Sequence, residues 1–87
     1  MKENTTKRCI EDLGNIVDIV LGDRFIVAQR SNGVIDVYDE DFKLLSSGVF
    51  SHIEKVNANS RVLIIRKNGS VDFYDKWLNY QFTKNVG

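Results

Sequence analysis

The chain has 87 residues, 43% of them hydrophobic, and its twelve basic and twelve acidic side chains give no net charge. This length suits one small domain with a core of marginal size, and the charge balance argues against a nucleic-acid partner, which needs a large positive patch. A single cysteine, Cys9, excludes an intrachain disulfide, and no apolar run approaches the roughly 20 residues that cross a bilayer, so we expect a cytoplasmic protein without a membrane partner.

The first 14 residues differ from the rest of the chain. Residues 1–14 show no alternation of apolar and polar side chains, and they predict an N-terminal arm with a short helix or an extra edge strand. From residue 15 onward, short runs rich in Val, Ile, Phe and Tyr are separated by Gly, Asn, Asp and Ser, which is typical of short strands joined by turns. The predicted strands are residues 16–21, 24–30, 34–39, 43–47, 52–57, 61–66, 70–75 and 78–83.

A long internal repeat organises these strands. The stretch SNGVIDVYD at 31–39 returns, with a few changes, as KNGSVDFYD at 67–75, which is 36 residues later. The same shift aligns Val20 with Val56 and Arg30 with Arg66. The sequence therefore predicts an all-β fold of two tandem four-stranded antiparallel units, residues 15–50 and 51–87, which together form one compact domain.

The Asn-Gly pairs of the repeat predict two hairpins. Asn-Gly between two β runs favours a two-residue type I′ turn with positive φ at both central residues. This register places Asp36 opposite Gln29 and Val37 opposite Ala28, and it leaves both faces of each sheet largely apolar. Because an antiparallel sheet exposed to water is apolar on one face only, we expect both faces of each unit to be covered.

The end of each repeat resembles a β-propeller blade of the WD-repeat type. Residues 33–39 and 69–75 each contain a turn glycine, an alternating apolar strand and a Tyr-Asp pair, and Ser51-His52 precedes Tyr74 by about the distance of that family's Gly-His pair. The resemblance covers about residues 15–83 and implies blade-like sheets. A closed propeller has at least about four blades, so the two units form a small sandwich or barrel, or belong to a longer parent, or assemble into a ring of several chains.

Opposite charge on the two halves supports the ring. Residues 15–50 contain six acidic and three basic residues, a net charge of −3, whereas residues 51–87 contain three acidic and six basic residues, a net charge of +3. Complementary ends of this kind can meet head to tail, so we expect a homo-oligomer.

The candidate binding residues follow the repeat. Each unit contributes an Asp, a Tyr two residues later and an Arg, namely Asp36, Tyr38 and Arg30 and then Asp72, Tyr74 and Arg66. Since an unpaired buried carboxylate is unfavourable, each Asp either makes structural hydrogen bonds or lines a polar pocket. Trp77 and Tyr80 gather near the last strand, where a partner chain could add to the sheet.

No catalytic or metal-binding motif is present in the sequence. His52 is the only histidine, the glycines stand singly, and no nucleophile–base pair can be assembled from the motifs, so we expect no enzyme, no metal and no cofactor. The function expected is a small non-enzymatic interaction module, bacterial or phage-encoded, that self-associates through its sheets and binds or inhibits another protein. The alternative is a protein that binds or sequesters a small ligand such as a nucleotide in pockets at subunit junctions.

Overall fold

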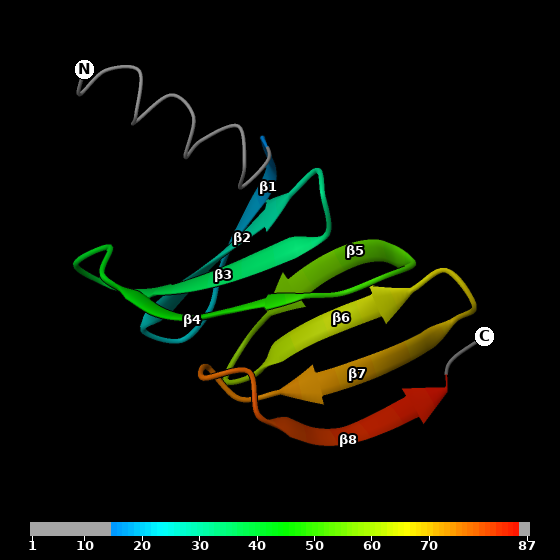
Figure 1. Cartoon of the computed structure of the whole chain (residues 1–87). Coiled ribbons are helices and arrows are strands. Elements are labelled where there is room, and N and C mark those ends of the chain that lie inside the picture. The colour runs from blue at the N-terminus through cyan, green and yellow to red at the C-terminus, as the bar shows by residue number, and fades with distance from the viewer. Residues whose placement is uncertain (1–14, 86–87) are drawn as a thin grey trace.

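The computed structural model describes residues 15–85, which form two four-stranded antiparallel sheets (Figure 1). The first sheet contains β1 (Ile16–Leu21), β2 (Phe25–Arg30), β3 (Val34–Asp39) and β4 (Leu44–Val49) in that order. The second sheet contains β5 (Ile53–Ala58), β6 (Val62–Arg66), β7 (Ser70–Tyr74) and β8 (Tyr80–Asn85), also in chain order. The predicted all-β fold with two four-stranded units is confirmed, while the helix or edge strand expected within residues 1–14 lies outside the described part.

Among residues 15–85 there is no helix of the length and apolar character that crossing a membrane would demand.

The turn before each last strand is built by an aspartate. Asp39 Oδ1 accepts hydrogen bonds from the backbone N–H groups of Asp41 at 2.8 Å and Lys43 at 2.9 Å. Asp75 Oδ1 accepts equivalent bonds at residues 77 and 79, both at 2.9 Å. Each of the two turns contains a residue with positive φ, which is Phe42 (62°) in the first sheet and Leu78 (61°) in the second. Because Leu78 belongs to the turn, β8 begins two residues later than the sequence predicted.

The hairpin between β2 and β3 differs from the prediction by one residue. Positive φ occurs at Gly33 (88°) but not at Asn32, and the Gly33 N–H donates to the carbonyl of Arg30 at 3.2 Å. This is a three-residue loop that ends in a left-handed glycine, not the predicted two-residue turn. Asp36 therefore pairs with Ala28 and not with Gln29. The hairpin of the second sheet repeats this geometry, with φ of 90° at Gly69.

This register changes which side chains share a face. Directly paired residues of antiparallel strands project to the same side. Ala28 and Asp36 therefore share one face of the first sheet, while Val27 and Val37 share the other. The predicted grouping of Ala28 with Val37 was wrong. The structural consequence is that Arg30, which alternates with Ala28, lies on the same face as Asp36.

At the first strand of each unit, structurally equivalent residues are one position farther apart in the sequence than the 36-residue shift indicates. Val20 pairs with Val27, whereas Val56 pairs with Ile64, which is the equivalent of Ala28. The predicted match of Val20 with Val56 was therefore wrong, and the structural equivalent of Val56 is Ile19. The cause is the first turn of the second sheet, residues 59–61, which has one residue fewer between paired positions than the turn at 22–25.

The two sheets stack face to face, with β1 and β2 lying against β5 (Figure 1). We call this interface the junction. Its buried core contains Phe25, Val27, Ile35 and Val37 from the first sheet and Val56, Val62 and Ile64 from the second. Within residues 15–85, hydrogen bonds cross it from Asp23 N–H to the Asn59 carbonyl at 2.7 Å and from Ser46 Oγ to the Lys76 carbonyl at 2.9 Å. One continuous core therefore joins both sheets.

Candidate functional site

A buried polar cluster links three strands of the first sheet. Asp36 is 3% exposed. Its Oδ2 accepts from Arg30 Nε at 2.8 Å and from the Tyr38 hydroxyl at 3.2 Å, and its Oδ1 accepts from Ser47 Oγ at 2.6 Å. The hydrogen bond to Asp36, followed by the one to Tyr38, raises the pKa of the Arg30 guanidinium above its ordinary value. Arg30 therefore stays charged at every pH at which proteins remain folded.

The second sheet repeats this cluster with less burial. Asp72 Oδ2 accepts from Arg66 Nε at 3.0 Å, and its Oδ1 accepts from Thr83 Oγ1 at 2.7 Å. Thr83 occupies the position of Ser47, 36 residues later. The hydroxyl partners were missed in the sequence, although both Ser47 and Thr83 follow their aspartate by 11 residues and the repeat could have revealed them. Both carboxylates act here as acceptors for side chains of their own sheet.

The two predicted tyrosines have different surroundings. Tyr38 hydrogen-bonds to Asp36, and its ring centroid lies 6.5 Å from that of Phe42. Tyr74 instead packs edge-on against Phe50, at 5.2 Å between centroids, and against Tyr80 at 5.8 Å. Phe50 belongs to the segment that joins the two sheets, so the chain itself covers Tyr74.

Trp77 and Tyr80 have different surroundings. Trp77 is in the turn between β7 and β8, with Lys76 Nζ 4.9 Å from its ring centroid. Tyr80 begins β8, and its hydroxyl shares a hydrogen bond of 2.7 Å with Thr83 Oγ1. Phe82, which lies two residues after Tyr80 in β8, pairs with Phe73 on the opposite face of the sheet. The three aromatic residues therefore do not form one surface.

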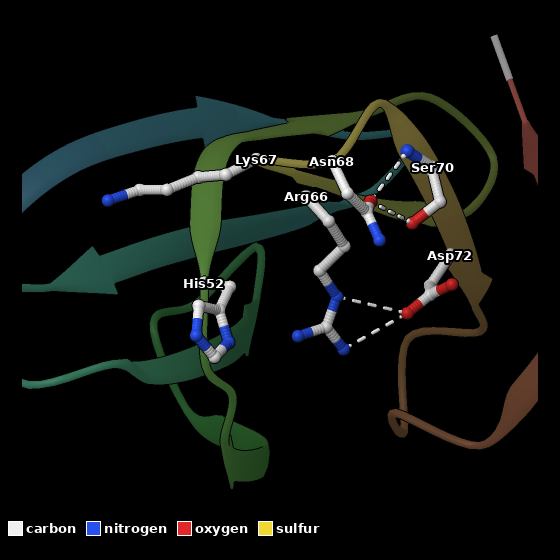
Figure 2. A pocket seen from close by; sticks show the side chains of 6 residues that line it. All are labelled: His52, Arg66, Lys67, Asn68, Ser70 and Asp72. Atoms are coloured by element: carbon white, nitrogen blue, oxygen red, sulfur yellow. Dashed lines mark hydrogen bonds and ion pairs between the residues drawn. The ribbon is translucent and has the colours of Figure 1, made fainter. Parts of the chain in front are cut away.

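A pocket of about 650 Å³ opens beside the second polar cluster (Figure 2). It is lined by His52, Arg66, Lys67, Asn68, Ser70 and Asp72. The Arg66 guanidinium points to Asp72 and also donates to the Ser51 carbonyl, while the Lys67 side chain extends away from it (Figure 2). Arg66 is thus engaged within the chain. No group of three or more metal-ligating side chains occurs among residues 15–85.

Several exposed apolar side chains lie on the first sheet, on the side away from the junction. We call this side the open face. It contains Ile26, Ala28, Arg30, Val34 and Tyr38 of the two central strands, together with the residues of β1 and β4 that pair with them. Its exposed apolar members are Ile16, Ile19, Leu21, Leu44 and Val49. Val49 is 77% exposed and Leu21 is 74% exposed. The apolar pattern of the strands predicts that this face is covered, and residues 15–85 leave these side chains exposed.

The second sheet also has a face turned away from the junction, which we call the distal face. Phe73 and Phe82 stack there with their ring centroids 4.4 Å apart. Arg61 and Lys84 lie over the Phe82 ring, at 5.4 Å and 5.9 Å from its centroid. Its apolar members are half-buried or buried and comprise Leu63, Ile65, Val71, Phe73 and Phe82. The distal face is therefore apolar at its centre and cationic at its rim.

Comparison with solved structures identifies the architecture. The chain is similar to BamB from Moraxella catarrhalis, a β-propeller protein, with a TM-score of 0.63 and 10% sequence identity. The match covers 80% of this chain and 23% of that chain. The two sheets are propeller-like blades. No protein-family model and no curated protein matches the sequence. At this identity the likeness shows the fold alone, and the WD-repeat type stays a prediction.

Proposed function

We propose that this chain is a non-enzymatic interaction module that binds a protein partner through the open face. The observation that carries the proposal is a difference between two equivalent positions. Val56 in the second blade is 1% exposed because the first blade covers it, whereas its equivalent Ile19 in the first blade is 54% exposed. The open face thus has the composition of a blade surface that packs against another blade, and it lacks such a neighbour among the described residues.

The physical driving force is burial of apolar area. Covering apolar surface contributes about 25 cal/mol for each Å² removed from water. The open face collects five large exposed apolar side chains on one side of a rigid sheet. Three of these side chains lie on β1 and two on β4, the outer strands of the sheet, and exposed apolar side chains gathered on one face of a domain indicate an interaction site. Protein binding therefore accounts for the open face without any further chemistry.

The small-ligand alternative has weaker support. The polar clusters of Asp36 and Asp72 are filled by donors of the chain itself, and Arg66 beside the pocket of Figure 2 donates both to Asp72 and to Ser51. A pocket that recognises a small ligand needs a few convergent polar groups directed into it. The side chains that satisfy these carboxylates are instead directed at one another.

The proposal is tested by photo-cross-linking from the open face. A photoreactive phenylalanine analogue is placed at position 49, and in a control variant at position 68, which is exposed in the turn between β6 and β7. In cells that produce the protein, we expect a discrete covalent adduct from position 49 and none from position 68. The adduct should disappear when Ile19→Lys is added, because the charge would have to be desolvated at the contact.

The readout separates partners from non-specific contact. An adduct that persists at the same yield with Ile19→Lys would mean that the open face is not the binding surface. The same result follows if position 49 gives no adduct while the protein is folded by circular dichroism. Mass spectrometry of the adduct then reports whether the partner is another protein or a second copy of this chain.

A further inference from the structure

We infer that the occupant of the open face is the distal face of a second copy of this chain, so that copies stack head to tail as consecutive blades. This inference rests on the proposed function and names the partner. The junction within one chain supplies the template, because it already shows how one blade of this sequence packs on the next. Such stacking requires that the open face and the distal face each resemble one of the two faces that meet at the junction.

The distal face reproduces the first blade's side of the junction. At the junction, that side presents Val27, Ile35 and Val37, which are each 0% exposed. Shifted by 36 residues, these positions become Leu63, Val71 and Phe73, which all lie on the distal face. Each equivalent is apolar: Leu63 and Phe73 are larger than Val27 and Val37, and Val71 is one methylene smaller than Ile35. The distal face therefore offers the same apolar row to a following blade.

The open face reproduces the second blade's side of the junction. That side presents Val56, Val62 and Ile64, all buried under the first blade. Their equivalents on the open face are Ile19, Ile26 and Ala28, each apolar. A distal face placed on the open face with the geometry of the junction thus brings an apolar row against an apolar row at each of these positions.

Charge at the outer edge selects this pairing. At the junction, Ser46 of β4 donates to the carbonyl of Lys76, and a Cβ added to Gly48 would lie 3.5 Å from Leu78 Cδ1. The outer strand of one blade therefore lies beside the turn before the last strand of the next blade.

The equivalents of these positions between two copies carry opposite charge. Phe82 and Lys84 replace Ser46 and Gly48 on the distal side, whereas the turn of the open side contains Glu40 and Asp41 in place of Lys76 and Trp77. In this placement Lys84 of one copy lies opposite Phe42 of the other, the equivalent of Leu78, in a turn that also carries Glu40 and Asp41, so the cation lies near two carboxylates.

Stacking of this kind closes when the blades complete a ring. Propellers typically contain four to eight blades, which corresponds to about two to four copies of a two-blade chain. The contact is heterologous, since one face of a copy meets the other face of its neighbour, and a heterologous contact ends only by closing a ring. The inference therefore includes a closed assembly of a fixed number of copies.

The test measures assembly of the purified chain by sedimentation velocity and light scattering. We expect a discrete oligomer at tens of micromolar protein, weakened by high salt because the edge charges are screened. Ile19→Asn should leave the fold intact and weaken assembly by roughly tenfold or more. Lys84→Glu and Glu40→Lys should each weaken assembly by roughly tenfold, and the double variant should recover most of the loss.

The chain offers a matched control for the charge changes. Lys76 occupies the position of Glu40 in the other blade, within the junction of the same chain, so Lys76→Glu makes an equal charge change away from the proposed contact. It should leave assembly unchanged.

Three outcomes would overturn the inference. The first is a folded monomer at all these concentrations, and the second is an oligomer that Ile19→Asn does not weaken. The third is an oligomer that the single change Trp77→Ser disrupts, because Trp77 belongs to the turn between β7 and β8 and not to the open or distal face. A monomer that still gives the position-49 adduct with a different protein overturns self-association and leaves the proposed function standing.

Discussion

Asp36 and Asp72 form the same ion pair with an arginine, but the two pairs differ in burial. The Asp36 and Arg30 side chains are 5% and 11% exposed, while the Asp72 and Arg66 side chains are 17% and 19% exposed. Removing one partner of a buried ion pair leaves the other charge unpaired in a poorly solvated place, whereas water compensates the same loss near the surface. The two positions therefore allow the strength of the same ion pair to be compared at two degrees of burial within one chain.

Asp36→Asn is expected to lower the free energy of unfolding by about 3 kcal/mol, and Asp72→Asn by about 1 kcal/mol. The reason is that Arg30 would lose its counter-ion under cover, while Arg66 would retain access to water. Urea denaturation of both variants at one fixed protein concentration checks the difference. Equal losses would show that the surrounding burial does not govern the strength of these pairs.

The hairpin loops decide the register of each blade. Gly33 has φ of 88°, and a Cβ placed on it would lie 2.5 Å from the Phe50 carbonyl oxygen. The Phe50 N–H in turn donates to the Gly33 carbonyl at 2.9 Å, so the loop is fixed against the segment that joins the two blades. Gly33 is thus required both for its backbone conformation and for the space beside it.

Gly33→Ala is expected to destabilise the fold by about 2 kcal/mol or more, from positive φ and from the contact with Phe50. Gly33→Asn separates the two causes, because asparagine tolerates positive φ and still carries a Cβ. We expect both variants to be destabilised to a similar degree in thermal unfolding. Recovery of stability in the asparagine variant would mean that backbone conformation alone requires glycine.

Strand positions and repeat could be predicted from the sequence, while register could not. Alternating Val, Ile and Tyr between Gly and Asn identifies all eight strands because strand pattern is local. The choice between a two-residue and a three-residue loop at Asn32-Gly33 depends on contacts with Phe50, which is distant in sequence. The same limit explains the error at Val56, since the shorter turn at 59–61 shifts the pairing of β5 without altering its apolar pattern.

The two blades depend on one another because they share a core. Ile64 in β6 and Val27 in β2 are both 0% exposed and belong to one buried cluster. A four-stranded sheet with both faces in water would expose most of these side chains, and small domains have little stability to spare. The chain is therefore expected to unfold as a single unit.

Ile64→Ala should cost about 2–5 kcal/mol and should raise hydrogen exchange in β3 of the first blade as well as in its own β6. Val27→Ala, the matched variant in the first blade, should raise exchange in β6 as well as in β2, by a smaller amount. Exchange measured on both variants by mass spectrometry checks this coupling. Exchange that rises only in the mutated blade would show that the blades unfold independently.

The hydrogen bonds across the junction have a consequence for how far such a sequence can diverge. The Asp23–Asn59 bond joins two main-chain groups, and the bond from Ser46 ends on the Lys76 carbonyl, so three of the four partner atoms belong to the backbone. Every residue other than proline carries those atoms, which leaves the side chains of these turns free to vary. Blade stacking in this chain therefore depends little on which side chains these junction positions carry.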